Sequence, residues 1–422
     1  RDRSPSRGLG DVYKRQSKWI EIIRTTNPEQ NMNKVKAGDI QSTAVTVTWT
    51  PGIQADAIVC TPSAANSSAK TVTYTLTATD ISSGSATVTG LEPETSYRAT
   101  LKLGEKTRGY STFTTNLDLR DAIQLTPTDD WVTAIQDAAA GSKFALAAGE
   151  YTLTSAKLQI NNNVTIAAQN SGNLPVINTC IHINNGSSLY LYQVVMDGTG
   201  TDGSQAIEYK TAGGFGDLII SGSEIRNYVK GLIYINVAAV ANTIKIENSI
   251  IHDIECSGGD FIDSRSGGWN NLIISSSTFY SCSAKRDILR ADDASSKVSA
   301  SMITSIDKCT FYNVGNGNAN YRFFYLRFPG NTNTFTNNVV ANFDNTRGFA
   351  NSTSVGVPSY SNNYNCKNLT SQAEGNTQPN LTCFDTEGNI LDKNPFADPD
   401  NADFTITDEL FQSYGFGDPR WY

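Results

Sequence analysis

This chain of 422 residues has few histidines and methionines, no long apolar run and no long basic cluster, and the last two absences exclude whole classes of protein. No apolar run approaches the roughly 18 residues that cross a bilayer, and the best stretch, residues 231–241, is short and interrupted by Asn236. We therefore expect no transmembrane segment. The 33 basic residues form no long cluster and are outnumbered by 41 acidic residues, so nucleic acid is not an expected partner.

Cysteine is also sparse, and its spacing argues against a metal site. The seven cysteines are odd in number and show neither Cys-x-x-Cys nor Cys/His spacing. We expect most of them to be small buried apolar side chains. Cys366 and Cys383 are the one pair whose closeness in sequence suggests a disulfide.

What the chain has in abundance is typical of a β protein, with 33 glycines, 18 tyrosines and many Asn, Ser and Thr residues. Its first 16 residues, RDRSPSRGLGDVYKRQ, have no initiator Met and no apolar signal core, and they resemble translated adapter sequence. We exclude them from the fold and expect a true signal peptide to be missing. Residues 17–36 are expected to be a linker or the remnant of a preceding module.

Residues 37–116 alternate apolar and polar side chains in short stretches, which predicts an antiparallel β-sandwich. The segment Gly90-Leu-Glu-Pro-Glu-Thr-Ser-Tyr97, together with Trp49, resembles a fibronectin type III module. The resemblance implies that Tyr97 forms a tyrosine corner and that Trp49 is the core aromatic. Such modules are mostly spacers, and a linker over 117–128 is expected to follow.

One amphipathic helix is expected after that linker. In residues 129–140, Trp131, Ile135 and Ala138 follow helical spacing behind an acidic N-cap. Because only strand patterns follow, we expect this helix to cap them.

The remainder of the chain repeats an apolar-x-x-polar-x-apolar fragment, such as Ile246-Glu-Asn-Ser-Ile-Ile251. Successive anchors are 25 to 32 residues apart, which predicts the coils of a parallel β-helix over 129–400 and a closing segment over 401–422. Asn248, Ser277 and Asn338 are expected in tight bends and side-chain ladders. The anchors are Ile166, Leu191, Ile220, Ile246, Ile274, Ile306, Phe335 and Tyr360.

The expected cap helix, followed by Ala147-Ala-Gly-Glu-Tyr-Thr-Leu153 and Val164-Thr-Ile166, is similar to the opening of pectate-lyase-like right-handed β-helix proteins. The tail, which ends in Gly417-Asp-Pro-Arg-Trp421, resembles surface proteins of polysaccharide-utilisation loci in Gram-negative bacteria, a family of unassigned activity. The resemblance implies an all-β fold, a lipid-anchored or secreted protein at the cell surface, and neighbouring outer-membrane glycan-uptake proteins.

The stretch KRDILRADDA (285–294) places charges of both signs in one strand, and neighbouring coils carry charge at the equivalent place. If Ile262, Leu289 and Leu326 form a buried column, strand alternation turns the residues beside them outward. The expected outer face consists of Phe261, Asp263, Arg265, Ile288, Arg290, Asp292, Tyr325 and Arg327.

This face has two interpretations. In one it is an idle ion-pair ladder of Asp263 and Arg290, worth about 0–1 kcal/mol. That ladder leaves Arg327 unpaired, and two arginines about 4.8 Å apart repel unless they share an anion. We therefore expect an acidic, uronate-containing glycan, with its carboxylate on the arginines and a pyranose on Tyr325. The expected binding residues are Phe261, Asp263, Arg290, Asp292, Tyr325 and Arg327, and binding requires no cofactor.

Two further functions stay open. By resemblance to β-helix lyases, Arg265 or Arg290 would be the base, although arginine starts at a pKa of about 12.5 and Ser264-Arg265 stands where those lyases carry lysine. Calcium ligands would then be Asp260, Asp263, Asp287 and Asp292. The other function is a structural or adhesive scaffold. Hydrolysis by paired carboxylates is less favoured because His252-Asp253 belongs to a different strand, and both histidines are expected to be packed or turn residues.

Overall fold

The computed structural model describes residues 29–64, 67–284, 286–315, 321–343, 349–350, 356–366, 389–391 and 394–422. The chain divides into two compact units, and the boundary lies between Asn116 and Leu117. The expected disulfide lies outside these residues, because Cys383 is not among them. The other five cysteines that we expected to be fillers are free and buried. No helix of the described part is long and apolar enough to cross a membrane.

The first unit consists of two antiparallel sheets, β1-β4 and β3-β2-β5-β6. Trp49 and Tyr97 are buried between them, and the Tyr97 hydroxyl accepts a hydrogen bond from the backbone N of Glu92 at 3.1 Å. Met32 is also buried and pairs with Trp49, so part of the expected linker 17–36 belongs to this core. The elements are η1 (Ala37–Asp39), β1 (Ala44–Thr48), β2 (Ala57–Pro62), β3 (Val72–Thr75), α2 (Ala78–Ser83), β4 (Ser85–Thr89), β5 (Ser96–Leu103) and β6 (Lys106–Thr114).

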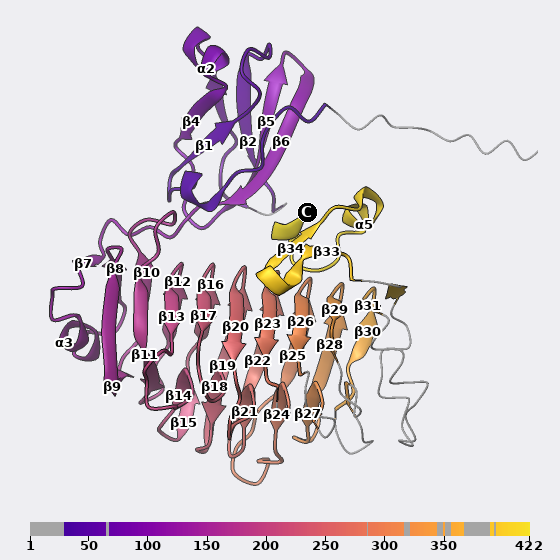
Figure 1. The fold of residues 1–422 in the computed structure, drawn as a ribbon. Coiled ribbons are helices and arrows are strands. Elements are labelled where there is room, and N and C mark those ends of the chain that lie inside the picture. Colours follow the sequence, from indigo (N-terminus) through magenta and orange to yellow (C-terminus); the bar gives the residue numbers. More distant parts are fainter. Residues whose placement is uncertain are drawn as a thin grey trace, which may run out of the picture. The chain divides into compact units, whose positions relative to one another are not determined.

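The second unit is a parallel β-solenoid (Figure 1). One of its sheets has eleven described strands and includes every anchor of the repeat. Its strands are β7 (Ile123–Leu125), β8 (Ser142–Leu146), β10 (Val164–Ala168), β12 (Leu189–Tyr192), β15 (Gly213–Phe215), β16 (Leu218–Ser221), β19 (Ala239–Glu247), β22 (Gly268–Ser275), β25 (Ile303–Asp307), β28 (Thr332–Thr336) and β30 (Ser359–Ser361). Because β7 pairs with β8, part of the expected linker 117–128 is a strand of the solenoid instead.

The other sheet has fifteen described strands and divides after β9 (Glu150–Ile160) and β11 (Val176–Ile183) into two limbs, as Figure 1 shows. Limb one is β13 (Val195–Asp197), β17 (Glu224–Arg226), β20 (Ile250–Ile254), β23 (Thr278–Cys282), β26 (Thr310–Val314), β29 (Val339–Ala341), β31 (Tyr364–Cys366) and β32 (Asn389–Leu391). Limb two is β14 (Ile207–Tyr209), β18 (Ile233–Ile235), β21 (Ile262–Ser264), β24 (Leu289–Ala291) and β27 (Phe324–Leu326). In each coil whose strands of both limbs are described, a loop joins the limb-one strand to the limb-two strand.

The repeat anchors lie in register from coil to coil, as the sequence predicts. Ile166 pairs with Leu191, and the pairing continues through every later anchor to Tyr360. Two residues after its anchor, each coil from Leu191 onward bends through a left-handed residue, such as Asn248 with φ 49° or Asn337 with φ 54°. Asn tolerates this conformation better than most residues, which explains its use at the bends.

A ladder of buried side chains follows the bend, also as predicted. The Ser249 hydroxyl accepts a hydrogen bond from the backbone N of Ser223 at 3.2 Å and donates one to the carbonyl of Glu247 at 2.7 Å. Ser277 repeats the arrangement one coil later, and Asn338 accepts from the backbone N of Cys309 at 2.8 Å. These side chains satisfy backbone N–H groups that the bend removes from the sheet.

Replacing Ser249 with alanine is expected to lower the free energy of unfolding by about 2 kcal/mol, because it leaves the buried N–H of Ser223 without an acceptor. Urea unfolding of the full chain measures the change. Ser275→Ala, at a partly exposed position one residue after an anchor, is the matched control and should leave stability nearly unchanged. Equal losses in both variants would contradict a special role for the ladder.

The expected cap helix is α3 (Trp131–Gln136), which lies beside β9 at the N-terminal end of the solenoid (Figure 1). It is shorter than the predicted 129–140. Asp130 caps it by accepting a hydrogen bond from the backbone N of Thr133 at 3.2 Å, and Trp131 and Ile135 are buried in the core.

The closing segment packs on the outer face of limb one. Asp418 accepts a hydrogen bond from the Thr278 hydroxyl at 2.8 Å, and the Trp421 indole donates to the same hydroxyl at 2.7 Å. Phe404 packs on the rings of Tyr280 and Tyr312. Its elements are β33 (Phe396–Asp398), η3 (Pro399–Asn401), β34 (Asp403–Ile406), α5 (Glu409–Tyr414) and η4 (Pro419–Trp421), so it begins before the predicted residue 401.

Candidate functional site

Limb two brings together the charged residues that the sequence singled out. Asp263 on β21 lies in register with Arg290 on β24, and Arg290 lies in register with Tyr325 on β27. Their neighbours Ile262 and Leu289 are fully buried, so the three residues lie on the opposite side of their strands, although Asp263 is itself only 1% exposed.

The expected buried column of Ile262, Leu289 and Leu326 is wrong in its third member, because Phe324 pairs with Leu289. The shift is two residues, so it preserves which side chains face outward. Arg327 consequently lies one row further along its strand than the sequence suggested.

Buried carboxylates hold the arginines of this face. Asp260 accepts hydrogen bonds from Arg265 at 3.0 Å, from Arg290 at 3.3 Å and from the backbone N of Asp287 at 3.1 Å. Its side chain is only 1% exposed. Asp260 therefore joins two coils through three donors.

The expected ion pair of Asp263 with Arg290 is replaced by other pairs. Asp263 accepts from Arg265 Nε at 2.9 Å, whereas Arg290 donates to the two oxygens of Asp292 at 3.0 and 3.1 Å. Arginine side chains are long enough to reach along their own strand. Arg265 and Arg290 each donate to the carboxylate two residues away in the sequence.

The arginine that we expected to be unpaired has a partner as well. Arg327 donates to Asp292 at 2.6 Å, and Arg322 lies 3.2 Å from Asp287. Four arginines thus face four aspartates, and no cation of this set is left without a carboxylate. We call this set the arginine–aspartate network: Asp260, Asp263, Arg265, Asp287, Arg290, Asp292, Arg322 and Arg327.

Tyr325 is the aromatic residue of the network, and arginines crowd its ring. The guanidinium carbons of Arg322, Arg327 and Arg290 lie 3.9, 4.7 and 5.4 Å from the ring centroid. These contacts are cation–π interactions. The flat face that we expected to receive a pyranose is therefore occupied by the protein's own side chains.

Three residues assigned to the outer face are buried instead, and the first is Asp263, which is 1% exposed beneath Arg265. Phe261 is 2% exposed and packs edge-on against Phe279, with ring centroids 6.1 Å apart, and Ile288 is 3% exposed. Phe261 and Ile288 precede their strands, where the loops from limb one return to the core. Phe261 cannot contact a ligand.

The four aspartates expected as calcium ligands are separated by arginines. Among the described residues, no group of three or more His, Cys, Asp or Glu side chains is arranged to hold a metal ion. Burial also raises the pKa of Asp287 to about 6, and metal ligands must be deprotonated. The calcium ligands that the resemblance implies therefore stay a prediction.

Neither Arg265 nor Arg290 has the surroundings of a base. Burial alone would lower the pKa of Arg290, but Asp292, Asp260 and Asp263 outweigh it and raise that pKa. The same balance, led by Asp263, raises the pKa of Arg265. Carboxylates that stabilise the charged guanidinium oppose proton abstraction by it.

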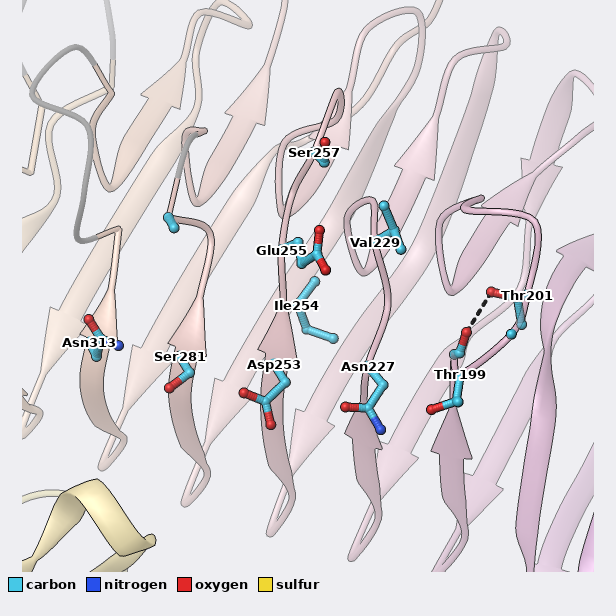
Figure 2. A pocket seen from close by; sticks show the side chains of 13 residues that line it. Thr199, Thr201, Asn227, Val229, Asp253, Ile254, Glu255, Ser257, Ser281 and Asn313 are labelled. Atoms are coloured by element: carbon cyan, nitrogen blue, oxygen red, sulfur yellow. Dashed lines mark hydrogen bonds between the residues drawn. The ribbon is translucent and has the colours of Figure 1, made fainter.

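A second feature, which the sequence did not reveal, is a row of polar side chains at the ends of the limb-one strands (Figure 2). Asn227, Asp253, Ser281 and Asn313 occupy the same place in four successive coils, each with a left-handed φ between 52° and 62°. Asn227 follows the last residue of β17, and the other three are the last residue but one of β20, β23 and β26, so the row lies where the chain leaves limb one. Strands about 4.8 Å apart give the row a regular spacing.

These side chains line an open cavity of about 690 Å³, which we call the groove. Its volume is in the range of small-molecule sites. The lining has two carboxylates, Asp253 and Glu255, and no Lys or Arg among the residues that form it. The lining residues are Gly198, Thr199, Gly200, Thr201, Asn227, Val229, Asp253, Ile254, Glu255, Ser257, Ser281, Ala284 and Asn313.

Asp253 is connected to His252, which the sequence led us to expect as a packed or turn residue. His252 Nδ1 lies 2.7 Å from Asp253 Oδ2, and His252 Nε2 lies 3.1 Å from Glu224 Oε1. His182 lies far away in the sequence of coils, on β11, with Glu208 at 3.5 Å. Two carboxylates thus flank the His252 ring beside the groove.

The sequence does contain a signal for the groove. Four polar residues each lie seven residues after the anchor of their repeat. They are Asn227, Asp253, Ser281 and Asn313, and their anchors are Ile220, Ile246, Ile274 and Ile306. Short polar residues that tolerate a left-handed φ, recurring at a fixed offset from the anchors, mark a row at the end of a strand. We attended to charge and so missed it.

The fold defines the class of protein as a parallel β-solenoid. Within it, residues 149–282 match the model described as "Domain of unknown function (DUF4957)", and residues 304–421 match "Domain of unknown function (DUF5123)". The groove residues from Gly198 to Ser281 lie inside the first match.

Comparison with curated proteins gives no match. Among solved structures, the chain is similar to the family 28 exopolygalacturonase of Yersinia enterocolitica, at 11% identity over 81% of this chain and 92% of that chain. The TM-score is 0.23, which is too low for this similarity to bear on the site.

Proposed function

We propose that this solenoid binds a polysaccharide in the groove. The observation that carries the proposal is the row of Asn227, Asp253, Ser281 and Asn313, which repeats once per coil along a 690 Å³ cavity. Amide, hydroxyl and carboxylate groups both donate to and accept from sugar hydroxyls. A row with the periodicity of the coils fits a polymer that runs along the solenoid axis.

The charges of the groove and of the arginine–aspartate network favour a neutral glycan over the uronate-containing glycan expected from the sequence. Asp253 and Glu255 would repel a sugar carboxylate in the groove. In the arginine–aspartate network, a uronate would have to displace Asp292 from Arg290 and Arg327. Breaking partly buried ion pairs offsets much of what a new pair contributes.

Binding without turnover is the activity that these contacts support best. A lyase requires a neutral base, and the carboxylates around Arg265 and Arg290 hold both guanidinium groups in the charged state. Lyase activity on polygalacturonate, alginate or chondroitin, detected by the ultraviolet absorbance of the unsaturated product, would contradict this.

Filling the groove is expected to abolish binding. Val229 lines it, is 38% exposed and uses only its backbone in hydrogen bonds, so Val229→Trp fills space without removing a polar contact. We expect affinity for the bound glycan to fall at least about tenfold, measured by affinity electrophoresis in gels that contain neutral or acidic polysaccharides. Ile303→Trp, at an exposed aliphatic residue on β25, is the matched control and should bind normally.

The same gels test the alternatives. Arg290→Ala and Arg327→Ala should leave retardation by a neutral polymer unchanged. Retardation by an acidic polymer that disappears in these two variants would move the binding site to the arginine–aspartate network. Absence of retardation by every polymer would favour a structural or adhesive scaffold.

We also propose that the first unit is a fibronectin type III-like spacer, which the buried Trp49 and the hydrogen bond between Tyr97 and Glu92 support. A right-handed winding, export to the cell surface and neighbouring glycan-uptake proteins complete the proposal. These three follow from the sequence resemblance alone.

A further inference from the structure

A continuous set of polar contacts runs from one part of the groove lining to another beneath its floor. At one end, Asp197 accepts hydrogen bonds from Thr199 at 2.6 Å and from Asn227 at 3.1 Å, and both donors line the groove. Arg226 joins Asp197, at 2.8 Å, to Glu224, at 2.5 Å.

His252 completes this set. Its Nε2 lies 3.1 Å from Glu224 and its Nδ1 lies 2.7 Å from Asp253, the acidic residue at the centre of the groove row. Two side chains that face the same cavity, Asn227 and Asp253, are thus connected through four intervening residues. We call this set, Asp197, Arg226, Glu224 and His252, the floor relay.

We propose that His252 is the positioning residue of the groove: it fixes the Asp253 carboxylate in the orientation that receives the glycan, and does so fully only when both of its ring nitrogens donate. This inference rests on the function proposed above and specifies how binding at that site depends on pH.

The His252 ring has little freedom to do anything else. It stacks on Tyr280 with ring centroids 4.6 Å apart and an interplanar angle of 5°, and Tyr280 packs in turn on Phe404 of the closing segment. The side chain is 12% exposed. Stacking fixes the ring plane, and the two carboxylates fix the direction of both nitrogens within it.

The effect of protonation follows from the count of donors. An imidazolium donates from both nitrogens, whereas a neutral imidazole donates from one and must accept with the other. Glu224 keeps Arg226 when it loses His252. Asp253 is more than half exposed, and His252 supplies the side-chain hydrogen bond that the structure gives to its carboxylate. Deprotonation of His252 therefore releases Asp253 or leaves the relay broken at Glu224.

The titratable groups that face His252 come from three strands. Glu224 and Arg226 lie on β17, Asp253 on β20 and the phenol of Tyr280 on β23. Burial opposes the imidazolium, but Glu224 and Asp253 outweigh it and raise the pKa of His252 above its usual value. The positioning effect is therefore complete at low pH and is lost as pH rises through that raised pKa.

The test uses the two histidines of the chain. Affinity for the neutral polymer that retards the protein most is measured from pH 5 to pH 9 for the wild type, His252→Gln, Asp253→Asn and the control His182→Gln, while NMR follows the imidazole signals. We expect about a tenfold loss of wild-type and His182→Gln affinity with rising pH, in step with the His252 titration. His252→Gln should bind weakly at every pH with a flat profile. Asp253→Asn should lower the His252 pKa.

Three results of these measurements would contradict the proposed role of His252. A wild-type profile that is flat while binding is strong overturns the inference and keeps the groove. A pH dependence that persists in His252→Gln overturns it as well. If no polymer binds at any pH, the proposed function fails first and the role of His252 in binding fails with it.

Discussion

Replacing Phe335 with alanine is expected to lower the free energy of unfolding by about 4 kcal/mol, the largest effect of any single change considered for this chain. Phe335 on β28 is fully buried, and its ring lies 5.4 Å from that of Phe323 and 5.8 Å from that of Phe311. Truncation leaves a cavity between this coil and the preceding coil, to which both rings belong. A solenoid has only neighbouring coils to close such a gap.

Urea unfolding of the full chain provides the measurement. Ile303→Ala on the adjacent strand β25 is the control, because Ile303 is 45% exposed and its removal leaves no cavity. A loss below about 2 kcal/mol for Phe335→Ala would mean that the aromatic cluster repacks.

Replacing Asp260 with alanine is expected to cost about 3 kcal/mol, even though Arg265 and Arg290 each keep a second carboxylate. The substitution removes three hydrogen bonds at once, including the one from the buried backbone N of Asp287. Breaking one side of a buried ionic group leaves its partners desolvated without compensation.

Asp260→Asn separates the contribution of the backbone hydrogen bond from that of the ion pairs, because the amide oxygen still accepts from Asp287 N but carries no charge. We expect the free energy of unfolding of Asp260→Asn to lie between those of the wild type and Asp260→Ala. Asp293→Asn, an exposed change beside the network, should leave the unfolding midpoint unchanged. If Asp260→Ala were as mild as this control, the network would be a solvated surface feature.

The sequence predicts the solenoid because each coil must bury the same columns. Ile246 and Ile274 are interchangeable members of one buried column, and the bend residue Asn248 follows its anchor at a fixed distance. The buried anchor and the bend residue recur from coil to coil. The repeat therefore predicts both the strand register of the eleven-stranded sheet and the serine ladder.

The same reasoning fails on limb two because loops of different length precede its strands. Counting from the anchors cannot fix a register across such loops, so Leu326 was assigned to a place that Phe324 occupies. Pairing is harder still, because a guanidinium can reach several carboxylates and burial decides among them. The sequence reasoning gives Asp263 the wrong partner and leaves Arg327 without the carboxylate that it contacts in the structure.

The closing segment bears on how the chain is made. Tyr280 and Tyr312 belong to coils that can form early in synthesis, yet Phe404 and Trp421, which cover the outer face of these coils, follow about a hundred residues later. Until then this aromatic surface is open to water and to other nascent chains.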